Sequence, residues 1–159
     1  MRIERLIIAL TYRCQCHCIH CSQAGYPVSQ TQELSFDEIA EVIDTASQYN
    51  LKELNLFGGE ALLRKDLFDL LSYARNRVEI LSLDTNGVAI GSEVAQAIAD
   101  VPVDTVYLSL HSATPERNET IYGRNGIFDS IKEATHRLVA AGVRVIYSMC
   151  LFKGLFDEE

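Results

Sequence analysis

The sequence lacks several features that would each indicate a different class of protein. No apolar run approaches the roughly 18 residues that a membrane-spanning helix needs. Basic residues do not predominate: 14 Lys and Arg stand against 22 Asp and Glu, so the net charge of −8 disfavours a nucleic-acid-binding surface. Low-complexity segments and blocks of like charge are also missing. We therefore expect neither a membrane nor a nucleic acid among the partners.

A secretory signal is not apparent either, because three of the first five residues are charged. We therefore expect a cytoplasmic protein, in whose reducing environment the five cysteines would not form disulfides. With 159 residues, of which 48% are apolar and 23% charged, the chain has the size and composition of one folded domain with a substantial core.

The most informative positive feature is a cluster of cysteines near the start of the chain. Cys14, Cys18 and Cys21 follow C-x3-C-x2-C spacing, and Cys16 lies among them. Iron in a [4Fe–4S] cluster is usually held by four cysteine thiolates. A cluster held by three would keep one iron open to a non-protein ligand, so this spacing indicates a site of chemistry.

Zinc is the main alternative metal that these thiols could bind. Structural zinc takes four ligands, commonly as two short pairs, and the chain has no second C-x2-C pair. His17, His20 or Cys16 could nevertheless complete a tetrahedron. The cysteines alone favour iron–sulfur over zinc, and leave zinc or a redox role for the thiols open.

The rest of the sequence alternates between strand and helix patterns. The run at residues 6–11 is almost uninterruptedly apolar, which is typical of a strand buried on both faces. A capping box at Ser35 and Glu38 starts a helix, and Gly142 ends the last one. Further strands are predicted over residues 53–57, 78–84, 103–110 and 143–152, and helices over 66–75, 92–100 and 128–141. This alternation predicts an α/β fold with right-handed βαβ units and a parallel sheet.

Distinctive residues follow each of the first four predicted strands. The cysteines follow the first, Gly58-Gly59-Glu60 the second, residues 85–87 the third, and residues 109–112 close the fourth. Each group alone has an ordinary structural explanation, such as a tight turn with a solvated glutamate. Because the carboxyl ends of parallel strands share one edge, where such folds bind ligands, the four together indicate one composite site.

These motifs together resemble those of the radical S-adenosylmethionine (SAM) enzymes, over nearly the whole chain. The cysteine motif, the Gly-Gly-Glu turn and Thr85-Asn86-Gly87 match the motifs of that superfamily. The region from Ser109 to residue 128 is closest in style to its peptide-maturing and molybdenum-cofactor-synthesis branches. The resemblance implies a partial (β/α) barrel of parallel strands, truncated to about four βα units plus a fifth strand. We expect residues 1–159 to be the radical SAM core domain, incomplete at its C-terminus, because a sixth strand is missing.

The resemblance also implies the roles of particular residues. Cys14, Cys18 and Cys21 would hold a [4Fe–4S] cluster whose open iron binds SAM. The residues implied to bind SAM are Gly58, Gly59 and Glu60 for the methionyl amino group, Ser109 with Asn86 for ribose, Arg124 for the carboxylate, and His20 near adenine. Cys16 is expected to be a bystander, Cys150 a buried core thiol, and His17 and His136 surface residues.

The implied activity is reductive cleavage of SAM followed by hydrogen abstraction from a substrate, most plausibly a peptide or protein. A reductant such as flavodoxin or ferredoxin would supply the electron. The sequence leaves two alternatives open. One is a small-molecule radical cyclase or isomerase of the molybdenum-cofactor type. The other is a non-catalytic fragment that binds an iron–sulfur cluster or zinc.

Overall fold

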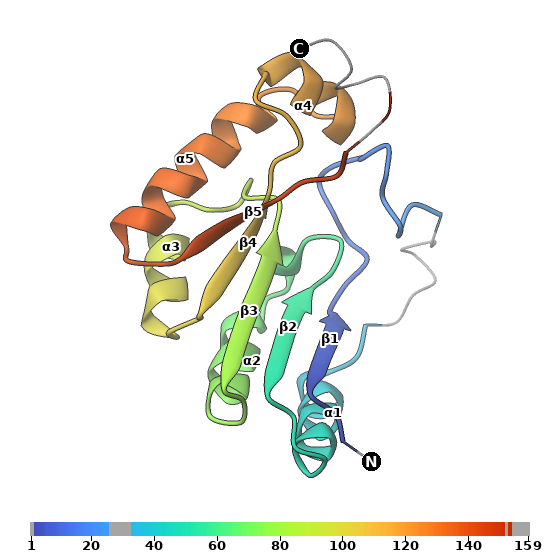
Figure 1. The fold of residues 1–159 in the computed structure, drawn as a ribbon, viewed down its shortest axis with the longest axis vertical. Coiled ribbons are helices and arrows are strands. Elements are labelled where there is room, and N and C mark those ends of the chain that lie inside the picture. Colours follow the sequence, from blue (N-terminus) through green and yellow to red (C-terminus); the bar gives the residue numbers. More distant parts are fainter. Residues whose placement is uncertain (1, 26–32, 152, 154–159) are drawn as a thin grey trace.

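The computed structural model describes residues 2–25, 33–151 and 153, which form a parallel sheet with helices (Figure 1). The five strands lie in sequential order, and each pairs in parallel with the next. They are β1 (Arg5–Ala9), β2 (Glu53–Phe57), β3 (Ile80–Thr85), β4 (Thr105–Ser109) and β5 (Val145–Ser148). This confirms the predicted parallel α/β sheet.

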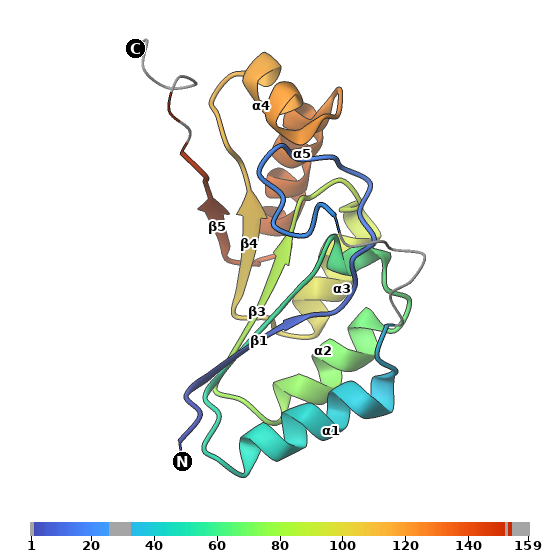
Figure 2. The same cartoon turned by 90° about the vertical axis from the view of Figure 1, so that its right-hand side faces the viewer.

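The helices lie between the strands in the sequence. They are α1 (Phe36–Ser47), the short 3₁₀ helix η2 (Ala61–Leu63), α2 (Leu67–Arg75), α3 (Ser92–Asp100), α4 (Pro115–Tyr122) and α5 (Ile127–Ala140). Because the strand order never reverses, right-handed crossovers carry every connecting helix to the same face of the sheet. Figure 2 shows α1, α2, α3 and α5 on that face. This one-sided arrangement is that of an open (β/α) barrel segment, as predicted, and the barrel is not closed.

Local sequence signals account for the helix ends. Ser35 and Glu38 form the predicted capping box: the Ser35 hydroxyl accepts from the Glu38 backbone N–H at 3.3 Å, and the Glu38 carboxylate accepts from the Ser35 N–H at 2.8 Å. Gly142 follows α5 with a φ of 81°, a left-handed conformation that glycine adopts without strain. Pro115 occupies the first turn of α4, where its missing N–H costs nothing.

The core lies between the sheet and its helices. Alternate residues of the central strands point to the helical face and are fully buried, including Leu54, Leu56, Leu81, Leu83, Val106 and Leu108. The residues between them point to the opposite, concave face, which no helix covers in Figure 2. Polar Asn55 and Ser82 lie on that face and hydrogen bond to each other at 2.9 Å. The apolar face therefore holds the fold together, while the opposite face carries polar groups.

Two predictions about burial are wrong. The first strand is not buried on both faces: Ile7 is 55% exposed, because β1 is an edge strand whose concave side is uncovered. Cys150 is exposed rather than a core thiol, because it follows β5, the opposite edge strand, which pairs only with β4. His17 and His136 are exposed, as predicted.

The elements also differ from the predictions in extent. The last strand ends at Ser148, although the prediction continued to residue 152, which lies outside the described residues. Helix α4 was not predicted, because its mostly polar sequence lacks helical apolar spacing. Within the part of the chain that the structure describes, no helix has both the length and the apolar character needed to cross a membrane.

Replacing Ser35 by Ala should remove one half of the capping box. We expect the free energy of unfolding to fall by about 1 kcal/mol, because a backbone N–H in the first turn of α1 loses its acceptor. Chemical denaturation measures this difference. The matched control is Ser92→Ala at the exposed start of α3, which has no side-chain cap hydrogen bond and should leave the stability unchanged. Equal losses in both variants would contradict the role of the capping box.

Candidate SAM and iron–sulfur site

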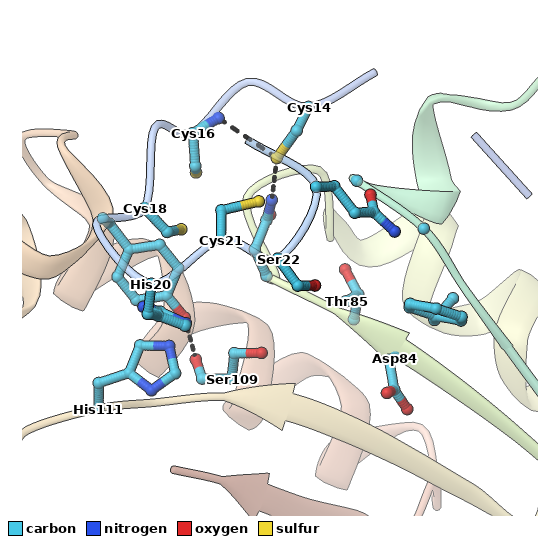
Figure 3. A pocket seen from close by; sticks show the side chains of 16 residues that line it. Cys14, Cys16, Cys18, His20, Cys21, Ser22, Asp84, Thr85, Ser109 and His111 are labelled. Carbon is cyan, nitrogen blue, oxygen red and sulfur yellow. Dashed lines mark hydrogen bonds between the residues drawn. The ribbon is translucent and has the colours of Figure 1, made fainter. Parts of the chain in front are cut away.

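A cavity of about 220 Å³ lies at the carboxyl edge of the sheet, between the strand ends and the cysteine loop (Figure 3). It brings together eight of the ten predicted site residues, namely Cys14, Cys18, Cys21, His20, Gly58, Gly59, Asn86 and Ser109. These residues come from the segments after β1, β2 and β3 and from the end of β4. The expectation that four post-strand segments form one composite site is therefore confirmed geometrically.

Backbone hydrogen bonds hold the cysteine loop over the strand ends. The loop leaves β1 with the Leu10 N–H donating to the Phe57 carbonyl at 2.8 Å. Farther along, the His17 N–H donates to the Tyr122 carbonyl and the Ile19 N–H to the Ile121 carbonyl, both at 2.9 Å. Helix α4, which the sequence patterns did not reveal, thus anchors the middle of the loop.

The motif thiols converge on the cavity. In Figure 3 the sulfurs of Cys14, Cys18 and Cys21 turn toward a common space, and Cys16 lies beside them. Hydrogen bonds from the Cys16 thiol and backbone, together with one from Asn86, lower the pKa of Cys14 to about 6 despite burial. Burial and the neighbouring sulfur charges of Cys14 and Cys21 raise the pKa of Cys18 to about 11. Cys14 is therefore available as a thiolate at neutral pH, and a bound cation would favour deprotonation of Cys18.

In the described part of the chain, the three motif thiols do not form a group within the 4.8 Å that a single metal ion requires. Four ligands on one zinc ion lie about 3.8 Å apart, given a Zn–S bond of about 2.3 Å. Among the described residues, one group of three potential metal ligands has its ligand atoms within 4.8 Å of one another. That group consists of His20, His111 and Cys150, and it includes none of the motif cysteines. In a cubane each thiolate binds a different iron, so its ligands stand farther apart. The donor set therefore fits a [4Fe–4S] cluster.

These three residues, His20, His111 and Cys150, are not arranged to bind zinc, because Nδ1 of His111 already accepts a hydrogen bond. His111 Nδ1 accepts the Cys150 backbone N–H at 3.1 Å. Burial, with a smaller effect of His20, lowers the pKa of His111 to about 4, so its ring is neutral at pH 7 and carries its proton on Nε2. The ring also packs edge-on against His20, with centroids 4.5 Å apart. His20 and His111 line the cavity, whereas Cys150 does not.

The two glycines of the Gly-Gly-Glu turn are required by the cysteine loop itself. A Cβ at Gly58 would lie 2.7 Å from the Thr11 carbonyl oxygen, and one at Gly59 would lie 2.7 Å from that of Tyr12 and still closer to that of Arg13. The same approach allows the Gly59 N–H to donate to the Thr11 carbonyl at 2.7 Å. The sequence prediction gave the glycines a role beside a ligand. The structure shows that they also let two backbone segments meet.

Replacing Gly59 by Ala should therefore displace the cysteine loop. We expect the iron content after anaerobic reconstitution to fall severalfold and the free energy of unfolding to fall by about 1–3 kcal/mol, because backbone atoms cannot yield to the added methyl group. Iron analysis and denaturation measure the two effects. The control is Gly91→Ala: a Cβ there meets nothing within 4 Å, and φ is −85°. Full iron loading in Gly59→Ala would disprove the close contact.

Glu60 does not line the cavity, although it was predicted to engage SAM. Its carboxylate is buried, and it accepts hydrogen bonds from the Asn86 N–H and the Thr85 hydroxyl, both at 2.8 Å, and from the Leu62 N–H at 3.1 Å. Burial raises the pKa of Glu60 to about 7, against the effect of these hydrogen bonds. Glu60 thus joins the turn after β2 to the turn after β3, and its contact with SAM stays a prediction.

The raised pKa of Glu60 predicts a pH-dependent stability. The folded state binds more protons than the unfolded state between the ordinary carboxyl pKa and about 7, so stability should fall as pH rises through this range. The loss should reach roughly 3 kcal/mol at most. Denaturation of the wild type and Glu60→Gln from pH 4.5 to 8 measures it, because the variant cannot titrate there. The exposed Glu41→Gln is the control and should keep the wild-type slope. An unchanged slope in Glu60→Gln would rule out this assignment.

Arg124 is the other predicted site residue that does not line the cavity. Its Nη1 donates to the Gln15 carbonyl at 3.3 Å, and its Nε is buried without a hydrogen-bond partner among the described residues. Gln15 belongs to the cysteine loop, so Arg124 contacts that loop. Its proposed contact with the SAM carboxylate remains a prediction.

Sequence reasoning missed five lining residues, namely Ser22, Gln23, Phe57, Asp84 and Tyr122. Phe57 and Asp84 stand directly before recognised motifs, and a charged residue in the apolar strand β3 was an available signal. Burial raises the pKa of Asp84, and Asn55 Nδ2 counters this by donating to its carboxylate at 2.8 Å. Tyr122 donates its hydroxyl to the Ser109 carbonyl at 2.6 Å, and so fixes the end of β4.

The fold and the site together define a class: an open (β/α) barrel segment whose carboxyl edge carries a cavity lined by cysteine thiols. The chain belongs to the radical SAM superfamily, whose family model matches residues 8–159. This confirms the resemblance drawn from the motifs.

Two curated relatives cover nearly the whole chain. It is 32% identical over 153 residues to a PqqA peptide cyclase of Streptomyces rochei, an alignment covering 96% of this chain and 42% of the relative. It is 31% identical over 157 residues to a probable GTP 3′,8-cyclase of Thermococcus kodakarensis, covering 99% and 50%. The chain thus spans about half or less of the length of these relatives.

A solved structure supports the fold. Streptococcus suis SuiB, crystallised with its precursor peptide SuiA, superposes with a TM-score of 0.80 at 17% identity, over 92% of this chain and 32% of that chain. At this low identity the similarity concerns the fold alone. Both the architecture and the family are therefore those that the motifs predicted.

Proposed function

We propose that the protein contains a radical SAM catalytic core that cleaves SAM reductively and abstracts a hydrogen atom from a peptide or protein substrate. The observation that carries this proposal is the convergence of Cys14, Cys18 and Cys21 on one cavity at the carboxyl edge of the sheet. Three thiolates suffice for three irons of a [4Fe–4S] cluster and leave the fourth iron for SAM.

The residues of the chain would hold and orient these cofactors. Cys14, Cys18 and Cys21 would bind the cluster, and the Gly58-Gly59 turn would keep their loop in place. When bound and reduced, the cluster would supply the electron for cleavage of a sulfonium C–S bond of SAM, and so the radical chemistry that removes hydrogen from the substrate. Ser109 lines the same cavity, where its hydroxyl can meet ribose. The neutral His111 and its neighbour His20 provide flat ring surfaces for adenine.

The substrate class rests on the relatives. The PqqA peptide cyclase is named for a peptide substrate, and the chain aligns with it over 96% of its own length. The probable GTP 3′,8-cyclase is named for a nucleotide, which favours a small-molecule cyclisation as the second candidate. A one-electron donor such as flavodoxin or ferredoxin would reduce the cluster in either case, and the cytoplasm would provide such donors.

Removing any one motif cysteine should abolish cluster assembly. After anaerobic reconstitution with iron and sulfide, we expect about four irons in the wild type and a loss of most of them in Cys14→Ala, Cys18→Ala and Cys21→Ala. Dithionite and SAM should yield 5′-deoxyadenosine with the wild type and with none of these three variants, as measured by chromatography.

Two other cysteines provide matched controls for this experiment. Cys150→Ala removes an exposed thiol and should leave both iron and 5′-deoxyadenosine unchanged. Cys16→Ala should also keep nearly all the iron, since Cys16 lies outside the three-cysteine motif. A colourless wild-type protein that holds stoichiometric zinc and forms no 5′-deoxyadenosine would refute the proposal. Equal iron loss in Cys16→Ala would refute the ligand assignment.

A further inference from the structure

The side chain of Asn86 lies against the sulfur of Cys14. Its Nδ2 donates to Cys14 Sγ at 3.6 Å, within the range of N–H···S hydrogen bonds. A second donor, the Cys16 backbone N–H, lies 3.4 Å from the same sulfur, as the dashed line in Figure 3 shows. The sulfur of one motif cysteine therefore receives two N–H groups, one of which comes from a side chain that mutation can remove.

The Asn86 amide is fixed in this orientation by bonds to its other atoms. Its Oδ1 accepts the Val88 N–H at 3.0 Å and Gln15 Nε2 at 3.3 Å, so the amide nitrogen must be the atom that faces the sulfur. Its backbone N–H donates to the buried Glu60 carboxylate at 2.8 Å. Asn86 is 7% exposed. This network holds the amide nitrogen against Cys14.

We propose that Asn86 tunes the electron affinity of the cluster by donating a hydrogen bond to the Cys14 ligand sulfur, and that Glu60 is the positioning residue that holds it there. This inference rests on the proposed function, since it requires the cluster. It assigns Asn86 to the cluster and not to ribose, the contact that the resemblance implied.

The physical basis is the charge on the sulfur. One-electron reduction adds negative charge to the cluster, and part of that charge resides on the thiolates. A hydrogen-bond donor stabilises the more negative state more strongly, and so makes the reduction potential less negative. Burial strengthens the effect, because water does not compete for the sulfur. Removing the amide N–H should therefore make the cluster harder to reduce without removing a ligand.

Two variants of Asn86 separate this role from a structural one. Asn86→Asp keeps the side-chain oxygen that accepts the Val88 N–H but cannot donate to the sulfur. Asn86→Ser is neutral, can still accept from Val88 through its hydroxyl, and is too short to reach Cys14. The control is Asn76→Ser at the exposed end of α2, where the amide contacts only its own helix.

The experiment measures iron content and the reduction potential of the reconstituted protein, without SAM, by potentiometric titration followed by electron paramagnetic resonance. We expect iron content to stay at the wild-type level in all variants. At a fixed solution potential, the ratio of reduced to oxidised cluster should fall up to about tenfold in Asn86→Ser, a shift of about 59 mV. The fall should be larger in Asn86→Asp, whose charge adds to the effect. Asn76→Ser should match the wild type.

Three results would overturn the inference. Unchanged potentials in both Asn86 variants at full iron content would show that the amide does not tune the cluster. Loss of SAM affinity with an unchanged potential would assign Asn86 to SAM. Loss of iron from both variants would assign it a structural role. A wild-type protein that forms no cluster would instead refute the proposed function, so the two failures are distinguishable.

The role of Glu60 has its own test in the same titration. Glu60→Gln should shift the potential in the same direction as Asn86→Ser, by a smaller amount, because it disturbs the Asn86 backbone and not the amide itself. The double variant Glu60→Gln/Asn86→Ser should shift no further than Asn86→Ser alone, since Glu60 acts through Asn86. Additive shifts would show that Glu60 acts on the cluster by another route.

Discussion

The close contact between the Gly58-Gly59 turn and the backbone of residues 11–13 is the constraint on which the site depends. Two hydrogen bonds join these segments, from the Gly59 N–H to Thr11 and from the Glu60 N–H to Arg13, at 2.7 and 2.8 Å. Side chains at the two glycine positions would separate them. The contact places the cysteine loop directly above the strand ends. Without it, the backbone of the loop would be held mainly by its hydrogen bonds to Phe57 and to the end of α4.

Beneath this contact, buried polar groups join one motif to the next. The Glu60 carboxylate reaches the turn after β3, and Asn86 in that turn reaches back to Cys14. A buried carboxylate with a raised pKa is costly, and three hydrogen bonds offset part of that cost. The motifs are thus parts of one hydrogen-bonded network as well as separate cofactor contacts. This explains how residues from three strand ends can fix the position of a single sulfur.

The sequence patterns predicted the fold well where side-chain periodicity determines it. Strand β2 and helix α3 have the predicted bounds, and the composite site forms at the predicted edge. The burial of β1 was predicted wrongly, because an apolar run does not reveal whether a strand lies at the centre or the edge of a sheet. The surroundings of the Glu60 carboxylate could not be predicted from the Gly-Gly-Glu motif either. That motif is compatible both with a carboxylate that lines the cavity and with one that is buried beside it. Asp84 was not predicted to line the cavity, because the sequence does not show which side of the end of β3 faces the cavity.

The central claim is that three thiolates hold a cluster whose fourth iron is open to SAM. Mössbauer spectroscopy of the protein reconstituted with ⁵⁷Fe, with and without SAM, tests this claim most directly. The account predicts that SAM changes the signal of one iron in four and leaves the other three unchanged, since those remain bound to Cys14, Cys18 and Cys21. Four equivalent irons that do not respond to SAM would contradict it.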